Sequence, residues 1–315
     1  MDWTLPPDDR DLLEAARAAA ERAAAVHRER AHEAATLRWE EKGTADFVTD
    51  TDREAESVIV ETLLGRFPDH AIVAEEAATA PIAPAGDPVA GSGRPVAGSG
   101  RPAVAAPTPA AAPIRWVIDP LDGTTNWLHG YPEYAASIAA IDAEGLRIGV
   151  VLNSATGETF TAVRGHGSRR DGEPIEVSAV AELRLALVGT GFPFKSLRSL
   201  PRYLDTFGRV LRSTSGVRRS GSAALDLCDV ACGRFDAFWE LALMPWDFAA
   251  GILIIREAGG LVERLRVQLD GPGPDGGEAA IDPGAGCGEP LWPGGVLAAN
   301  PRLFEPFRAL VLEAD

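Results

Sequence analysis

Hydrophobic residues alternate with small or polar residues in three consecutive stretches of the first half of the chain, at 135–141, 147–152 and 158–163. Successive side chains of a β-strand point to opposite faces, so this alternation predicts strands. A glycine lies in each of the two short connections, which predicts antiparallel pairing. The pattern therefore predicts a sheet here, and periodicity alone supports a mixed α/β protein.

Helical spacing of apolar residues dominates the other parts of the chain. Residues 8–38 are rich in Ala and Arg and predict a long N-terminal helix with a solvated charged face, and a second amphipathic stretch covers 54–64. In the second half we expect strands at 185–189, 237–240 and 295–299, and helices at 203–211, 223–231 and 246–257. This alternation of strands and helices predicts a second α/β layer.

Two segments differ from the rest in composition. Residues 78–113 are dominated by Pro, Ala and Gly, and the heptapeptide PVAGSGR occurs there twice in tandem, at 88–94 and 95–101. We interpret this segment as a flexible insertion and expect a solvated loop, with a lid or a contact to a neighbouring subunit as the alternatives. A Gly-, Pro- and Asp-rich stretch at about 270–290 predicts a second loop insertion.

Composition limits the class of protein. The 315 residues are 46% hydrophobic, which is enough to bury a large core, and the formal net charge is −16. That charge argues against nonspecific binding to nucleic acid or to an anionic membrane surface. The sequence has no apolar run long enough to span a bilayer and no signal-peptide pattern at its start, so we expect a cytoplasmic protein.

The run WVIDPLDGTTN at 116–126 carries the strongest chemical signal. Its apolar start predicts the end of a buried strand, which Pro120 is expected to stop. Asp119 and Asp122 would then point into one pocket, where two carboxylates repel unless a divalent cation or a proton lies between them. Gly123 and the threonines after it suit a tight turn and a helix opening, whose N–H groups favour phosphate. An isolated DPxDG sequence is equally consistent with an ordinary turn.

Three more acidic positions occur along the chain. Glu75 and Glu76 follow a short apolar run, Asp247 opens a helical stretch, and Asp52 precedes the amphipathic stretch at 54–64. Each alone is consistent with a solvated charge pair or a helix cap.

Taken together and in this order, these motifs resemble the inositol monophosphatase family of metal-dependent phosphatases, bacterial inositol-1-monophosphatase branch, over residues 42–300. The family's two signatures are similar to WVIDPLDGTTNWLHG and PWDFAAGILIIREAGG in this chain, and the SGSAA run at 220–224 fits between them. One departure is Ala74, where the family usually has glycine. The resemblance implies an α+β fold, the five-layer αβαβα sandwich of the inositol monophosphatase and fructose-1,6-bisphosphatase type. It also implies an N-terminal half (1–178) with most metal ligands and a C-terminal half (179–315) with Asp247 and substrate contacts.

The resemblance assigns roles to individual residues. The implied metal ligands are Glu75, Asp119, the main-chain carbonyl of Leu121, Asp122 and Asp247. The implied catalytic residues are Glu75, Thr124 and Asp52, with Thr124 and Asp52 flanking the attacking water. The implied substrate-binding residues are Gly123, Thr124, Thr125, Ser222, Ala223, Glu240 and Asp247.

The chemistry expected from the resemblance is metal-assisted hydrolysis. Magnesium prefers oxygen ligands, so two or three Mg²⁺ ions, with Mn²⁺ as a substitute, would be held by the carboxylates, and Asp119 is our candidate bridge. One ion would activate a water whose proton passes to Glu75 or Thr124, and the other would stabilise the departing alkoxide. Direct hydrolysis without a protein nucleophile is our hypothesis. Lithium sensitivity and a homodimer are implied by the resemblance as well.

The substrate is expected to be a small phosphorylated metabolite. Glu240 resembles the residue that hydrogen-bonds a ring hydroxyl in inositol-phosphate enzymes, although a cap or surface carboxylate is the alternative. The GTGFPF run at 189–194 also resembles the inositol-phosphatase branch. We therefore predict myo-inositol 1-phosphate first, then histidinol phosphate, then fructose 1,6-bisphosphate or 3′-phosphoadenosine 5′-phosphate. A non-catalytic regulatory binding module is the hypothesis from a different class.

Overall fold

The computed structural model describes residues 3–32, 39–43, 46–76, 113–194, 199–265, 291 and 293–312, without side chains at 39–43 and 46–48. The predicted insertion at 78–113 lies outside the described residues except for residue 113, and the predicted loop at about 270–290 lies wholly outside them.

A seven-stranded sheet forms the first half of the molecule. Its strands are β3 (Ala71–Ala74), β4 (Arg115–Asp122), β5 (Ala135–Asp142), β6 (Gly145–Asn153), β7 (Thr159–Val163), β8 (Gly167–Arg170) and β9 (Glu173–Pro174), side by side in that order. β3 is parallel to β4, and the other neighbours are antiparallel. The three strands predicted from alternation are β5, β6 and β7.

Both faces of this sheet are covered by helices, which is why its central strands are apolar on both sides. On the outer face, Trp116 and Ile138 pack with α1 (Pro7–Arg30) and α2 (Asp50–Arg66). On the inner face, Val117 and Val151 pack with α6 (Ala223–Ala231) and α7 (Pro245–Glu257). Alternate residues of one strand therefore belong to two different cores.

A five-stranded sheet forms the second half. Its strand order is β11 (Gly216–Arg218), β10 (Leu187–Thr190), β12 (Ala237–Leu243), β14 (Gly294–Ala299) and β13 (Leu261–Leu265). β10 is parallel to β11 and β12, while β14 is antiparallel to β12 and β13. A short 3₁₀ turn, η2 (Leu183–Leu185), precedes β10.

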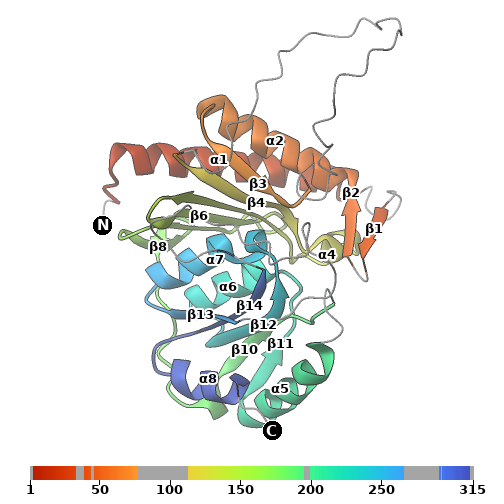
Figure 1. Cartoon of the computed structure of the whole chain (residues 1–315), viewed down its shortest axis with the longest axis vertical. Coiled ribbons are helices and arrows are strands. Elements are labelled where there is room, and N and C mark those ends of the chain that lie inside the picture. Colours follow the sequence, from red (N-terminus) through yellow and green to blue (C-terminus); the bar gives the residue numbers. More distant parts are fainter. Residues whose placement is uncertain are drawn as a thin grey trace, which may run out of the picture.

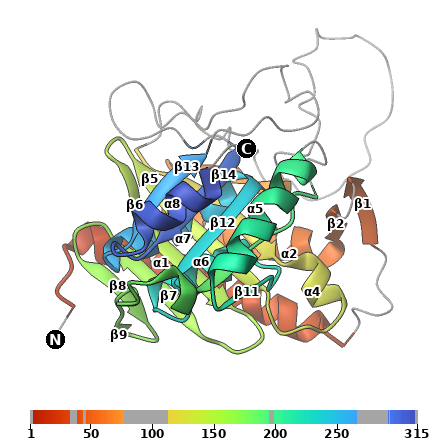
Figure 2. The same cartoon turned by 90° about the horizontal axis from the view of Figure 1, so that it is seen from below.

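The elements stack as five layers. Figure 1 shows α1 and α2 above the first sheet, α6 and α7 between the two sheets, and α5 (Leu200–Ser213) and α8 (Phe304–Leu312) beyond the second sheet. Figure 2, turned by 90°, shows α5 and α8 lying across that outer face. In β12, Trp239 packs toward α5 and α8 and Phe238 toward the central helices. This is the α+β, αβαβα arrangement expected from the sequence.

Several details differ from the sequence-based expectation. The N-terminal helix ends at Arg30 rather than at residue 38, and residues 33–38 lie outside the described ranges. A hairpin of β1 (Trp39–Gly43) and β2 (Asp46–Thr49) was not predicted. β4 also continues past Pro120 to Asp122 instead of stopping at the proline. The division of the chain at residue 178 stays a prediction.

The central layer is tightly packed at two glycines. A Cβ atom on Gly149 of β6 would lie 2.9 Å from the carbonyl oxygen of Ala250, and one on Gly251 of α7 would lie 2.7 Å from the Leu227 side chain. These absent side chains let α7 approach both the sheet and α6. Within the described residues, no helix is both long enough and apolar enough to cross a membrane.

Candidate metal and phosphate site

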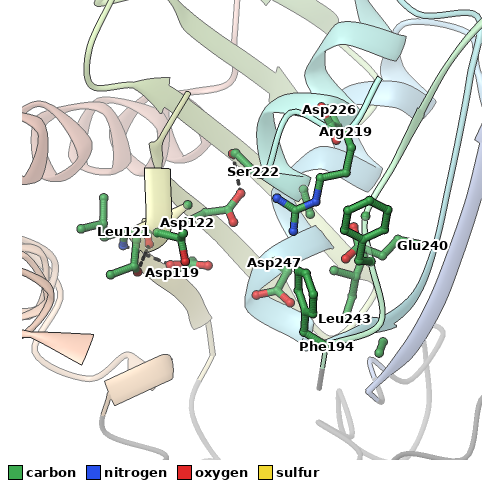
Figure 3. A pocket seen from close by; sticks show the side chains of 18 of the residues that line it. Asp119, Leu121, Asp122, Phe194, Arg219, Ser222, Asp226, Glu240, Leu243 and Asp247 are labelled. Carbon is green, nitrogen blue, oxygen red and sulfur yellow. Dashed lines mark hydrogen bonds between the residues drawn. The ribbon is translucent and has the colours of Figure 1, made fainter. Parts of the chain in front are cut away.

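A cavity of about 360 Å³ opens where the end of β4 faces the beginnings of α6 and α7. All but one of the site residues predicted from the sequence line it: Glu75, Asp119, Leu121, Asp122, Gly123, Thr124, Thr125, Ser222, Ala223, Glu240 and Asp247. Figure 3 labels six of them, Asp119, Leu121, Asp122, Ser222, Glu240 and Asp247. Asp52 is the exception, because it lies behind Thr124 and does not line the cavity.

A β-bulge directs the two carboxylates of β4. Asp119 pairs with Ser137 and Asp122 with Ala135, so three steps along β4 match two steps along β5. In a regular strand, residues three apart point to opposite faces of the sheet. The extra residue of a bulge shifts one of them, so that both side chains point to the same face. The main-chain N–H of Leu121 donates to Asp119 Oδ1 at 3.0 Å. Both carboxylates therefore reach the cavity, as Figure 3 shows.

Asp122 also connects the two halves of the molecule. Its Oδ2 accepts a hydrogen bond from the Ser222 hydroxyl at 2.6 Å and from the N–H of Ala224 at 2.8 Å. Ser222 is at the same time the N-cap of α6 and accepts from the N–H of Leu225 at 3.3 Å. The first turn of α6 thus holds the carboxylate that ends β4.

Asp247 lies in the first turn of α7. It is 6% exposed, and its Oδ2 accepts from the N–H of Met244 at 2.8 Å, so it caps its own helix while it lines the cavity. Capping of α7 and a place in the cavity lining are therefore compatible, and the role of Asp247 as a ligand stays a prediction.

Thr124 connects Asp52 to the bulge. Its Oγ1 lies 3.0 Å from Asp52 Oδ1 and 3.0 Å from the carbonyl oxygen of Leu121, and its single proton is donated to one of them at a time. Asp52 Oδ2 accepts from the N–H and the hydroxyl of Thr49 at 2.9 and 2.6 Å. Burial raises the pKa of Asp52 to about 6, and the negative charge of Glu75 adds to the increase.

The cavity lining is strongly acidic. Glu75, Asp119, Asp122, Asp226, Glu240 and Asp247 supply carboxyl groups, and Arg219 is the only cation among the described lining residues. Burial raises the pKa of Asp226 well above its ordinary value, which favours its neutral form. The remaining carboxylates require positive charge nearby.

The donor set fits a hard divalent ion such as Mg²⁺, because carboxylate and carbonyl oxygens are its preferred ligands. Within the described part of the chain, however, no three His, Cys, Asp or Glu side chains stand close enough together to hold an ion as they are. The hydrogen bonds from Ser222 to Asp122 and from Met244 to Asp247 hold these two carboxylates at the beginnings of α6 and α7. An ion held by three of these side chains would therefore bring them closer together than they stand here.

Sequence reasoning assigned no site role to part of the lining. The residues it left out are Gly191, Phe192, Phe194, Arg219, Gly221, Asp226, Ala242 and Leu243. The GTGFPF run and the Arg218–Arg219 pair contain four of them, Gly191, Phe192, Phe194 and Arg219, but nothing in the sequence indicated that these two segments meet.

Comparisons with known proteins identify the family of this chain. The model of the inositol monophosphatase family matches residues 8–303. The chain is 43% identical over 224 residues to the Nus factor SuhB of Pseudomonas aeruginosa, with 70% of this chain and 73% of that protein covered. It is 42% identical over 224 residues to the inositol-1-monophosphatase of Synechocystis, with 71% and 69% covered.

Two solved structures extend the likeness to the whole fold. The extragenic suppressor protein SuhB from Bartonella henselae superposes with a TM-score of 0.74 at 31% identity, covering 96% of this chain and 99% of that one. The inositol monophosphatase from Anabaena superposes with a TM-score of 0.69 at 30% identity, covering 97% of each chain.

Proposed function

This chain belongs to the inositol monophosphatase family, and from that premise we propose that it is a magnesium-dependent phosphomonoesterase that hydrolyses a small polyol phosphate, with myo-inositol 1-phosphate as first choice. One observation carries the proposal. Four carboxylates from three distant segments, Glu75, Asp119 with Asp122, and Asp247, line one cavity together with three helix beginnings.

The proposed ligands of Mg²⁺, or of Mn²⁺ in its place, are these four side chains and the carbonyl oxygen of Leu121. They supply only oxygen atoms, and Asp119 and Asp247 are almost fully buried, at 2% and 6% exposure. Two or three bound ions would neutralise the acidic lining, activate a water and stabilise charge on the transferred phosphoryl group and the leaving oxygen.

The path for the water's proton would run through Thr124. Its hydroxyl can accept a proton from the water while it donates its own to Asp52 Oδ1, 3.0 Å away. Thr49 holds the other oxygen of Asp52, so the receiving carboxylate has a fixed orientation. Glu75 lines the cavity directly and is the alternative acceptor.

The phosphate would be oriented by main-chain groups. Gly123, Thr124 and Thr125 line the cavity at the start of α4 (Thr124–Leu128), and Ser222 and Ala223 line it at the start of α6. The N–H groups of a first helical turn favour an anion. Gly123 has φ of +91°, and a Cβ there would lie 2.8 Å from the carbonyl oxygen of Glu133, so the turn requires glycine.

A comparison of four esters tests the proposal. Phosphate release would be measured with myo-inositol 1-phosphate, histidinol phosphate, fructose 1,6-bisphosphate and 3′-phosphoadenosine 5′-phosphate, each with Mg²⁺ and with chelator. We expect magnesium-dependent release, with the highest kcat/KM for myo-inositol 1-phosphate. A higher kcat/KM for another of the four would reassign the substrate, and no release from any of them would reject the enzyme proposal for these substrates.

A second candidate function comes from the relatives. The Pseudomonas aeruginosa protein and the Escherichia coli protein, at 43% and 38% identity, both carry the name Nus factor SuhB. A regulatory role like theirs is the binding-module alternative. Asp122→Asn would separate the candidates, because a role that does not depend on turnover would survive the loss of catalysis.

Three further proposals follow from family membership: a homodimer, a cytoplasmic location and inhibition by lithium at a magnesium position. The charge of −16 supports a protein that works without nucleic acid or membrane.

A further inference from the structure

Arg219 is held at the wall of the cavity by two aromatic rings. Its guanidinium carbon lies 5.1 Å from the ring centroid of Phe192 and 5.4 Å from that of Phe194, and the two rings meet edge to face at 5.6 Å. Tyr203 supports Phe192 from behind at 5.7 Å. Stacking of this kind orients an arginine without using its N–H groups.

Those N–H groups have no hydrogen-bond partner among the described residues. Within the described ranges, the Arg219 guanidinium forms no hydrogen bond or ion pair. Figure 3 shows it pointing into the cavity, across from Asp122 and above Asp247. An arginine that lines an acidic cavity with its donors unused is suited to bind acceptor atoms of a ligand.

Glu240 supplies a hydrogen-bond acceptor in the same part of the cavity. It lies on β12, and a Cβ atom at Gly191 would fall 2.1 Å from its carboxylate carbon. The missing side chain of Gly191 therefore provides the space that this carboxylate occupies. Both residues line the cavity with Arg219.

A buried carboxyl oxygen also indicates a ligand at this end of the cavity. Asp226 lines the cavity, is 2% exposed, and its Oδ1 has no hydrogen-bond partner although it is buried. Such an atom costs free energy until a hydrogen-bond partner reaches it.

From this arrangement, and on the basis of the function proposed above, we infer that Arg219 determines specificity by donating hydrogen bonds to hydroxyl oxygens of the leaving alcohol, so that the site selects neutral polyol phosphates over amino-alcohol phosphates. Arg219 and Glu240 provide one positive and one negative group, so this end of the cavity matches an uncharged ring whose hydroxyls both donate and accept.

The positive charge of Arg219 is the selective element. Histidinol phosphate carries an ammonium group on its alcohol part, and Arg219 would repel that group, whereas the hydroxyls of inositol accept its hydrogen bonds. Specificity is the difference between the binding free energies of the two esters. The repulsion of histidinol phosphate therefore adds to the favourable hydrogen bonds of inositol phosphate.

The test is the ratio of kcat/KM for myo-inositol 1-phosphate to kcat/KM for histidinol phosphate, measured on the full-length protein with Mg²⁺. Loss of a hydrogen bond from a charged donor should lower the ratio about tenfold in Arg219→Gln. Reversal of the charge should lower it by about 100-fold or more in Arg219→Glu, because the ammonium group is then attracted.

The matched control is Arg218→Glu. Arg218 is the preceding residue, carries the same charge and is exposed, but it does not line the cavity, so we expect its ratio to equal that of the wild type. Thermal melting of each variant verifies that it is folded. A ratio in folded Arg219→Glu equal to the wild-type ratio would overturn the inference and leave the phosphatase proposal intact, whereas wild-type protein that hydrolyses neither ester would reject the phosphatase proposal itself.

Discussion

At the scale of single residues, His27 shows how a buried side chain supports the segment that carries the candidate ligands. His27 is fully buried in α1, its Nδ1 lies 2.8 Å from the Ser154 hydroxyl, and its carbonyl oxygen accepts from the Trp127 indole at 3.0 Å. Trp127 belongs to α4, the helix that begins at Thr124. The N-terminal helix therefore contacts the short helix whose first residues line the cavity.

His27 also predicts a pH dependence of stability. Burial lowers its pKa to about 3, so the folded protein keeps the ring neutral while the unfolded chain takes up a proton near pH 6.5. The contribution of the neutral His27 ring to the free energy of unfolding is complete above pH 6.5. It is lost as the pH falls toward 3, at about 1.4 kcal/mol per pH unit.

We expect His27→Gln to be less stable than the wild type at pH 7.5, because it loses the packed ring. The difference in the free energy of unfolding between the two proteins, measured with urea, should shrink as the pH falls from 6.5 to 5. A difference that is constant over this range would contradict a neutral buried histidine.

At the scale of secondary-structure elements, the approach of α7 to the first sheet positions Asp247. α7 packs on β4, β5, β6 and β7, and the backbone of Ala250 sits directly over Gly149 of β6. Asp247 is one turn earlier on the same helix, so a change in this contact moves a candidate metal ligand.

Gly149→Ala is therefore predicted to lower the free energy of unfolding by about 1–3 kcal/mol, the usual cost of overpacking, and to lower kcat/KM as well. Gly65→Ala in α2 is the matched control. It has open space around the new methyl group and should be neutral or stabilising by up to about 1 kcal/mol, since alanine favours a helix. Equal effects of the two substitutions in urea unfolding would show that the contact is unimportant.

Elements with a clear apolar period were predictable, and elements without one were not. β5, β6 and α7 bury long apolar sets, and their predicted bounds differ from the observed ones by no more than two residues. β1 has the sequence WEEKG and β8 the sequence GSRR, which contain no alternating apolar run. Their pairing depends on neighbours that the local sequence does not specify.

At the scale of the whole molecule, the cavity is assembled from segments that are far apart in the chain. Asp119, Asp122 and Gly123 belong to one contiguous motif, so the sequence predicted that they act together. Arg219 and Phe194 meet only because β10 and β11 are neighbours in the second sheet. Local sequence contains no information on that contact, and for this reason the part of the cavity wall formed by Arg219 and Phe194 was not predicted. The bulge that aligns Asp119 with Asp122 likewise depends on β5.

The hydrogen bond between Ser222 and Asp122 joins these two parts of the cavity, and magnesium would have to draw Asp122 toward Asp119 and Asp247. The proposed hydrolysis therefore depends on a carboxylate cluster that would work only with a metal ion.

The most direct test is phosphate release from myo-inositol 1-phosphate by the wild-type protein and by Asp122→Asn across a magnesium titration that starts in chelator. We predict no release in chelator, a rise with added Mg²⁺ in the wild type, and a rate lower by at least about 100-fold in the variant at every magnesium concentration. Circular dichroism would verify that the variant is folded. Release that persists in chelator, or equal rates for the two proteins, would contradict the account.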